Sequence, residues 1–373
     1  MPRAKGAYAV PPSASSGAQE LIVGTYTERL PHVDGQAEGI GSCRFEGGTI
    51  GPVRLLAPTR NPSFVVLSPD GSRLYAVNET VEFEDQPGGG VTAFARDPRS
   101  GELTRLNSRP SAGVEPAHLE LDPTGRFLLV ANYRSGSVAV FALEADGSLG
   151  PMTDHDQHSG SSIDPVRQTG PHAHMILFDP VTNDVLVPDL GLDAVLFYTL
   201  SSEGKLTEHP ERRIGTRRGA GPRHLAFHPD GNHLFLVNEL DNTAEVLRRT
   251  GDGFKAINVA STLPAGFAEH SQAAAIRVSP SGRTVLVSNR GEASDTIALF
   301  RFDPDQGSLE LLESVPSGGR EPREFVFSPD GRFVIVADQD SDVLVVMEFS
   351  DDEPGLHQIS SAPVPTPVCL LIG

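Results

Sequence analysis

Leu67-Ser68-Pro69-Asp70-Gly71 decides the fold, because the chain repeats its pattern five more times. In each copy an apolar run leads into Ser, Asp or His followed by Pro, then a tight turn, then a second apolar run that ends in Asn or Asp. The prolines are 49 to 57 residues apart, a period typical of a β-propeller whose repeats are four-stranded blades. The other copies are Leu121-Asp122-Pro123-Thr124-Gly125, Phe178-Asp179-Pro180-Val181-Thr182, Phe227-His228-Pro229-Asp230-Gly231, Val278-Ser279-Pro280-Ser281-Gly282 and Phe327-Ser328-Pro329-Asp330-Gly331.

The length of the chain fits seven blades, since seven repeats at this period use about 350 of the 373 residues. Residues 21–26 align with residues 128–133, so the chain starts on the second strand of a seventh blade. The first strand of that blade is predicted at residues 367–372, and joining both ends in one blade closes the ring. We therefore expect an all-β, seven-bladed propeller with four antiparallel strands per blade over residues 21–373, preceded by a disordered tail over residues 1–20.

The composition argues against several classes of partner. With 30 basic and 49 acidic side chains the formal net charge is −19, which disfavours nucleic acid and anionic membrane surfaces. No apolar run approaches the ~18 residues of a membrane span. The N-terminal stretch lacks the apolar centre of a signal peptide, so we expect a cytoplasmic protein. Cys43 and Cys369 are predicted to be free thiols, and a ring with covered edges favours a monomer.

One end of the ring is predicted to hold a site. The repeated turns all lie at the other end, where turn geometry explains Pro, Asp and Gly, so His228 in the fourth turn is expected to be structural. The segments that lead into each first strand and leave each second strand bring His, Arg, Glu and Asn side chains together around the axis, where propellers hold concave pockets. The candidates at this end are His118, Asn132, Arg134, His172, His174, Arg223, Glu239, Asn289, Arg290 and Arg323.

The acidic candidate is Glu239, which closes a second strand sixteen residues after Arg223. It is either a catalytic carboxylate or the ion-pair partner of an arginine, and Glu79 occupies the same place in the first blade as its rival. Several arginines that converge at one mouth of a strongly acidic protein indicate a clamp for an anion.

The histidine candidates form a His-x-His pair. His172 and His174 are two residues apart on a predicted inner strand, so both side chains are expected on one face. One of them is expected to reach the channel, while the alternative is a structural histidine bonded to the backbone. A metal site made of this pair with Asp189 and Glu239 has no tight ligand spacing, so neither a metal nor a cofactor is expected.

Five motifs follow one another at blade spacing: Val23-Gly24-Thr25-Tyr26-Thr27, Gly170-Pro171-His172-Ala173-His174, Gly221-Pro222-Arg223-His224-Leu225, Val237-Asn238-Glu239-Leu240 and Ser288-Asn289-Arg290-Gly291. In this order they resemble the propeller-type lactonase family, which includes bacterial 6-phosphogluconolactonases and fungal carboxy-cis,cis-muconate cyclases. The likeness covers roughly residues 20–373. It implies a seven-bladed fold, no required cofactor, and a site of one His, two Arg and one Glu at the channel mouth.

Carried over by motif, this resemblance implies His172 or His174, Arg223, Glu239 and Arg290 as the site. Two segments depart from the family pattern. Residues 153–168 are long and polar and are expected to form a flap over the mouth, and residues 82–90 form a loop that alters the local shape of the pocket.

The favoured hypothesis is hydrolysis of a sugar lactone, with 6-phosphoglucono-1,5-lactone as substrate and 6-phosphogluconate as product. Glu239, assisted by His172 or His174, would act as general base on a water, and Arg223 would stabilise the oxyanion. The residues assigned to substrate binding are Arg290 and Arg134 for the phosphate, Asn132 and Asn289 for sugar hydroxyls, and His118 and Arg323. The alternatives are a lyase that forms or opens a carboxymuconate lactone and a non-enzymatic propeller scaffold.

Overall fold

The repeated Pro-containing segments form the turns between the first and second strands of six blades, in a computed structural model that describes residues 17–251 and 253–372. In the first blade the Gly71 N–H donates to the Ser68 carbonyl at 2.8 Å, and Gly71 has φ 68°. Proline presets the turn, and glycine adopts a positive φ without steric cost. In the third blade the turn is one residue longer, and Asn183, with φ 61°, takes the place of glycine.

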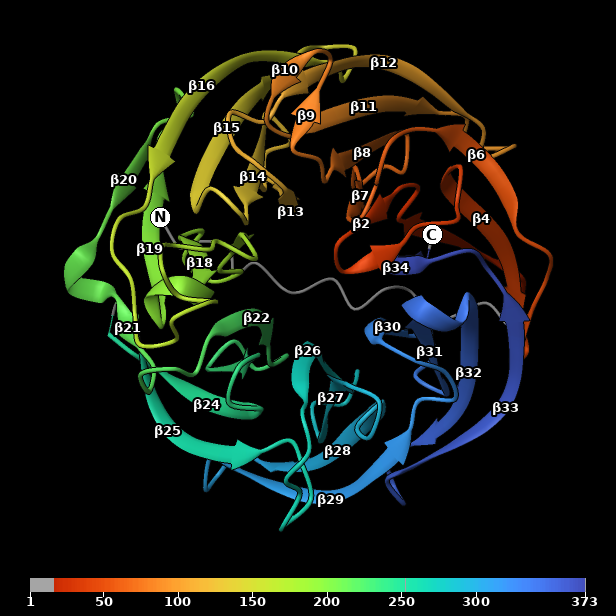
Figure 1. Ribbon diagram of the computed structural model, residues 1–373, viewed down its shortest axis with the longest axis vertical. Helices are drawn as coiled ribbons and strands as arrows, with labels where there is room; N and C mark the ends of the chain where they lie inside the picture. The colour runs from red at the N-terminus through yellow and green to blue at the C-terminus, as the bar shows by residue number, and fades with distance from the viewer. Residues whose placement is uncertain (1–16, 252, 373) are drawn as a thin grey trace, which may run out of the picture.

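The blades stand around a central axis, with the first strand of each blade innermost and the last at the rim (Figure 1). Within each blade consecutive strands pair antiparallel, as predicted. The first three blades consist of β7 (Val65–Leu67), β8 (Arg73–Asn78), β11 (Gly90–Arg96) and β12 (Leu103–Pro110); β13 (Pro116–Leu121), β14 (Phe127–Asn132), β15 (Ser137–Leu143) and β16 (Leu149–Gln157); and β17 (Leu177–Phe178), β18 (Val185–Asp189), β19 (Ala194–Leu200), β20 (Leu206–Glu208) and β21 (Ile214–Gly215).

The next three blades repeat this order. They consist of β22 (Pro222–Phe227), β23 (His233–Asn238), β24 (Thr243–Thr250) and β25 (Gly253–Ser261); β26 (Gln272–Val278), β27 (Thr284–Arg290), β28 (Thr296–Asp303) and β29 (Ser308–Pro316); and β30 (Pro322–Phe327), β31 (Phe333–Asp338), β32 (Val343–Ser350) and β33 (Gly355–Pro363).

The seventh blade joins the two ends of the chain. β1 (Gln19–Thr25) pairs on one side with β4 (Gly39–Glu46), followed by β5 (Thr49–Ile50) and β6 (Arg54–Pro58), and on the other with β34 (Pro367–Ile372). Figure 1 shows the blue end of the chain against its red beginning. The predicted closure is confirmed, while β1 begins at Gln19, two residues before the expected start of the propeller. Most of the predicted tail, residues 1–16, and residue 373 lie outside the described residues.

The hydrophobic core lies between neighbouring blades. Leu21 and Val23 of the seventh blade pack against Ile335 and Val346 of the sixth, and equivalent clusters fill the spaces around the ring. Because both faces of a blade are covered, its second strand reads as a continuous apolar run rather than an alternating one. The rigid ring therefore fixes the ends of its inner strands, which carry the candidate residues.

The two cysteines are buried in the seventh blade without a bridge, as predicted. Burial raises the pKa of both the Cys43 and the Cys369 thiols to about 12, so they act as small apolar side chains.

The remaining elements are small. Two short hairpins, β2 (Arg29–Leu30) with β3 (Val33–Asp34) and β9 (Glu82–Phe83) with β10 (Gln86–Pro87), extend from the seventh and first blades. Over the described residues the helices are three single 3₁₀ turns, so none there is long or apolar enough to cross a membrane. They are η1 (Leu190–Leu192), η2 (Pro210–Arg212) and η3 (Gln339–Ser341).

Candidate active site

A cavity of about 320 Å³ lies on the axis at the end where first strands begin and second strands finish. We call it the axial cavity. Of the residues that the sequence singled out, Glu79, His174, Glu239, Arg290 and Arg323 line it. Its eleven lining residues are His32, Glu79, Glu115, Ala117, Tyr133, Arg167, His174, Glu239, Gln272, Arg290 and Arg323.

Glu239 lies in the cavity wall, where it contacts three arginines, and its side chain is almost fully buried. Its Oε1 accepts from Arg167 Nη2 at 2.5 Å, while its Oε2 accepts from Arg223 Nε at 3.0 Å and lies 3.2 Å from Arg290 Nη2. Burial raises the pKa of Glu239, but Arg290, Arg167 and Arg223 outweigh burial and hold it well below the usual range. The carboxylate is therefore ionised, and both of its oxygens are occupied.

Arg223 holds Glu239 from behind and does not line the cavity. Its Nε donates to Glu239 and its Nη1 donates to the Ala274 carbonyl at 2.8 Å, so these two nitrogens are bound to protein groups. Burial, with Arg290 adding to it, lowers the pKa of Arg223 to about 9, which leaves the guanidinium charged at neutral pH. The structure thus places this predicted oxyanion group one layer behind the cavity surface.

Arg290, by contrast, faces the cavity with a free donor. Its side chain is 8% exposed, and its buried Nε has no hydrogen-bond partner among the described residues. A buried donor without a partner is costly, and a bound anionic oxygen would satisfy it.

His174 presents a neutral imidazole to the same cavity. Its ring packs against Tyr133 and His224, with centroids 5.2 and 5.1 Å away, and its buried Nδ1 has no partner within the described part of the chain. Burial, followed by the charge of Arg223, lowers the pKa of His174 well below its usual value. The ring therefore keeps a lone pair free at neutral pH.

His172 does not line the cavity, although the pair was expected on one face. Its Nδ1 lies 3.0 Å from the Tyr133 carbonyl, and its ring stacks on the Tyr133 ring with centroids 4.9 Å apart. Residues 172–174 precede β17 and make an isolated bridge, Ala173 to Asp189. Both rings pack against Tyr133, but of the two histidines His174 alone lines the cavity.

The opposite wall carries the rival carboxylate. Glu79 accepts from Tyr26 Oη at 2.8 Å and from Ser63 Oγ, and Arg323 Nη2 lies 3.9 Å from its Oε2. Arg323 also lies over the Tyr26 ring, 5.3 Å from its centroid. Glu79 and Glu239 are thus both in the cavity, each held by its own set of donors.

The cavity is locally cationic in a strongly acidic chain. Including Arg223, four guanidinium groups surround it, against the three carboxylates of Glu79, Glu115 and Glu239. The arrangement suits an anionic ligand, because the guanidinium groups of Arg167, Arg290 and Arg323 line the same small volume.

Four predicted binding residues lie elsewhere. Arg134 is at the rim, with its side chain 59% exposed and its Nη1 bound to Glu115 Oε1 at 2.9 Å. His118 lies buried beyond the cavity wall, where its ring packs on Phe64. The two predicted amides tie backbone carbonyls instead of facing the cavity: Asn132 Nδ2 to Ser111 at 3.1 Å and Asn289 Nδ2 to Thr262 at 3.0 Å.

Several cavity residues were missed from the sequence, and Arg167 is the most prominent. Residues 158–168, the non-strand part of the segment expected to form a flap, do carry Arg167 to the cavity, where Nη2 also donates to Tyr133 Oη at 2.8 Å. The length and polarity of that segment were the available signal. The other lining residues absent from the prediction are His32, Glu115, Ala117, Tyr133 and Gln272.

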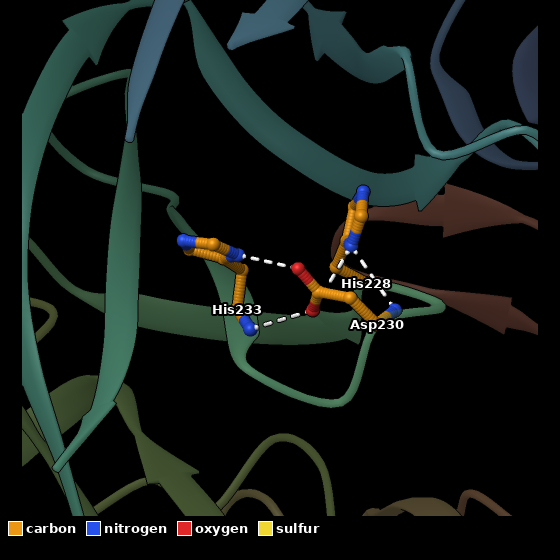
Figure 2. A group of neighbouring side chains, drawn as sticks. All are labelled: His228, Asp230 and His233. Atoms are coloured by element: carbon orange, nitrogen blue, oxygen red, sulfur yellow. Dashed lines mark hydrogen bonds and ion pairs between the residues drawn. The ribbon is translucent and has the colours of Figure 1, made fainter. Parts of the chain in front are cut away.

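A second histidine cluster lies at the opposite end of the ring, in the turn of the fourth blade (Figure 2). His233 Nδ1 lies 2.8 Å from Asp230 Oδ2, and His228 Nδ1 accepts from the Asp230 N–H at 3.1 Å. Within the described residues they are the one group of three or more His, Cys, Asp or Glu side chains whose possible metal-ligand atoms all lie within 4.8 Å of one another.

Turn chemistry explains this cluster without a metal. Asp230 Oδ1 accepts from the Asn232 N–H at 2.7 Å, as Asp70 Oδ1 accepts from the Ser72 N–H at 3.0 Å in the first blade. His228 Nε2 meets the Gly282 carbonyl of the next blade at 3.1 Å. His228 therefore has the structural role expected for it.

Comparison with known proteins points to one family. The family model described as Lactonase, 7-bladed beta-propeller, matches residues 20–372 of the chain. A curated 6-phosphogluconolactonase from Bacillus subtilis is 37% identical over 354 residues, which cover 93% of this chain and 96% of the relative. Another from Formosa agariphila is 30% identical and covers 91% and 94%.

A solved structure agrees with this assignment. The structure of a periplasmic gluconolactonase from Pseudomonas aeruginosa matches with a TM-score of 0.88 and 35% identity, covering 95% of this chain and 99% of that one.

Proposed function

The chain belongs to the seven-bladed β-propeller lactonase family and is a lactonase, and from this premise we propose that it hydrolyses 6-phosphoglucono-1,5-lactone to 6-phosphogluconate. The observation that carries the proposal is the pairing of His174 with Arg290 in one cavity. A neutral imidazole and a guanidinium, each with a nitrogen free of protein partners, are the base and the charged donor that ester hydrolysis needs.

In this mechanism His174 takes a proton from the water that attacks the lactone carbonyl. Glu239 was the expected base, but both of its oxygens are bound by arginines in the unliganded protein, and Oε2 is held by two of them, whereas His174 has a ring nitrogen without a partner among the described residues. We assign Glu239 instead to positioning: it holds Arg290, which lines the same cavity as His174, and it balances part of the charge of the arginine cluster.

Arg290 then stabilises the negative charge that develops on the carbonyl oxygen. This role was expected for Arg223, which lies behind the cavity surface with its Nε and Nη1 bound to protein groups. Arg290 lines the cavity, and its buried Nε has no partner among the described residues, so a developing oxyanion that reaches it would satisfy it. When the ring opens, the proton on His174 passes to the leaving alkoxide.

The curated relatives carry the names of hydrolases, so the lyase alternative is not carried forward. We also propose that the enzyme is a monomer in the cytoplasm. The closed ring and the two buried, unbridged thiols support this, and a mass of 39.7 kDa in solution would agree with it. A dimer by light scattering would contradict it.

The test is hydrolysis of freshly generated 6-phosphoglucono-1,5-lactone and of glucono-1,5-lactone, each measured against its spontaneous rate. We expect strong acceleration with the phosphorylated lactone by the wild-type chain and a large loss in the His174→Gln variant. Phosphorylated lactone that reacts no faster than the enzyme-free control would overturn the substrate assignment.

A further inference from the structure

We propose that Arg167 is the residue that selects a phosphorylated lactone, by turning from Glu239 to the phosphate of the substrate. The inference rests on the proposed function and adds a specificity-determining residue to it. Arg167 lies on residues 158–168, which cross to the cavity between β16 and the third blade. We call this segment the strap.

The strap is fixed at both ends. His158 Nδ1 lies 2.7 Å from the buried Asp189 Oδ2, and its Nε2 lies 3.0 Å from Tyr198 Oη. At the other end Gln168 Nε2 donates to the Leu190 carbonyl at 2.8 Å and to Asp193 Oδ1 at 2.7 Å. These contacts are buried, so the course of the strap over the cavity is set by the fold.

The backbone of Arg167 is fixed as well. Asp164 Oδ1 accepts from the backbone N–H groups of Val166 at 2.8 Å and Arg167 at 2.7 Å, which closes a compact turn. With its Cα held, Arg167 can reach different partners only by changing side-chain rotamers. A long side chain on a fixed backbone is suited to exchange one anionic partner for another.

The exposure of the three arginines on Glu239 separates their roles. The side chain of Arg167 is 31% exposed, against 2% for Arg223 and 8% for Arg290. Both of its hydrogen bonds come from Nη2, and its Nε and Nη1 donate to nothing in the described part of the chain. Arg167 is therefore the arginine that a ligand meets first, with donors to spare.

When Arg167 leaves Glu239, other arginines still balance the negative charge of the carboxylate. Arg223 and Arg290 stay on Oε2, so the buried carboxylate keeps two cationic partners when Arg167 leaves Oε1. A phosphate carries about two negative charges and three acceptor oxygens, and an arginine can bind two of them at once. The exchange gives up the contacts of Arg167 with Glu239 and Tyr133 and gains two contacts with a more highly charged group.

The other cationic groups at this end are less suited to the phosphate. Arg290 is deep in the cavity beside Glu239, where the proposed function places the carbonyl oxygen. Arg323 is stacked on Tyr26 and faces Glu79, and Arg134 is bound to Glu115 at the rim. Arg167 is thus the most exposed of the three arginines that line the cavity, at 31% against 14% for Arg323 and 8% for Arg290.

The experiment compares kcat/KM for 6-phosphoglucono-1,5-lactone with that for glucono-1,5-lactone in wild type, Arg167→Ala and Arg167→Lys. The control is Arg217→Ala, an arginine that is 73% exposed, paired with Asp241 and outside the cavity. We expect the preference for the phosphorylated lactone to fall about 10- to 100-fold in Arg167→Ala, the range of a charge-assisted hydrogen bond. Turnover of the unphosphorylated lactone should fall much less than turnover of the phosphorylated one, and Arg167→Lys should keep part of the preference.

Calorimetry gives a readout independent of turnover. Arg167→Ala should weaken binding of 6-phosphogluconate and leave binding of gluconate unchanged. Equal losses of kcat/KM on both lactones in an active, folded variant would overturn the proposed role of Arg167 but not the proposed function. Arg167 would then act only through Glu239. A wild-type chain that accelerates neither lactone would overturn the proposed function and this inference with it.

Discussion

Arg223 on β22 donates through Nε to Oε2 of Glu239, which directly follows β23, across 3.0 Å, and both side chains are almost completely buried. Pairs of this kind are poor sources of net stability but costly to break, because the partner left behind is a charge without a counterion. The cavity wall therefore depends on Glu239 for its integrity as well as for its chemistry.

Replacement of Glu239 by Gln should destabilise the fold. The change leaves Arg223, Arg290 and Arg167 without their shared counterion, and we expect the free energy of unfolding to fall by about 3–5 kcal/mol. Urea unfolding measures it. Glu46→Gln is the matched control, since Glu46 pairs with Arg44 at an exposed site and should cost less than about 1 kcal/mol. Equal, small losses in both variants would contradict the role of Glu239 as counterion.

Replacement of His174 by Gln should act on kcat. A general base contributes about 10²- to 10⁴-fold, so kcat should fall by that factor while KM changes little. Steady-state kinetics on the phosphorylated lactone measure both constants. His172→Gln is the control, because its ring lies outside the cavity and contacts the Tyr133 backbone. A larger loss of kcat in His172→Gln than in His174→Gln would reverse the assignment.

The stability of the fold should depend on pH through His118. Burial, with Arg277 and Arg223 adding to it, lowers the pKa of His118 to about 3, whereas the unfolded chain binds this proton near pH 6.5. Stability from the neutral ring is therefore present above pH 6.5 and is lost as pH falls, by about 1.4 kcal/mol per unit.

His118→Phe removes this pH-dependent contribution to stability while keeping a ring against Phe64. The free energy of unfolding of the variant relative to wild type should rise by about 2 kcal/mol between pH 6.5 and 5.0, because all other titrating groups cancel in the difference. Urea unfolding at the two pH values measures it. If the free energy of unfolding changed equally with pH in the variant and in wild type, His118 would have the same pKa in the folded and the unfolded chain, against the prediction.

Deletion of residues 367–373 should abolish the fold. β34 pairs with β1 and buries Cys369 and Leu370 between blades, so its loss exposes an edge strand and opens the ring. We expect no cooperative thermal transition by circular dichroism. A truncated chain that melts as sharply as wild type would show that the seventh blade is dispensable.

A circular permutant is the control for that deletion. Ile372 pairs with Leu21 as Leu67 pairs with Leu74, so a copy of residues 68–73 fits between the two ends as a seventh turn. With new termini opened in the turn at Gly125, every strand is kept, and the permutant should fold.

The sequence predicts the ring well because the signal is local and repeated. The proline turns fix where each blade bends, and the apolar runs between them fix the strands, so the seven blades, the shared blade and the end that holds the site all follow. The site itself depends on where individual side chains end, which the repeat does not encode. His172 and His174 illustrate this, since both rings pack against Tyr133 while, of the two, His174 alone lines the cavity.

The asparagines at the ends of second strands show that a polar residue repeated from blade to blade can have a structural role. Asn78, Asn132 and Asn289 each donate to a carbonyl just after the last strand of the preceding blade. The recurrence of an amide at this position in several blades indicates a role in the fold, whereas Arg167 occurs once. Arg167 was missed for a different reason, because the path of the strap is set by contacts with distant residues such as Asp189 and Asp193.

The shared seventh blade also orders the events of synthesis. β1 is among the first strands made, but its partner β34 emerges about 350 residues later, which at about 5–20 residues per second is on the order of 20–70 s. Throughout that interval one backbone edge of β1 is unpaired. Leu21 and Val23 also lack their packing partners from the sixth blade and from β34. A ring without edges in its finished form therefore passes through a long-lived open state on the ribosome, and that state is where this chain is most exposed to pairing with another copy.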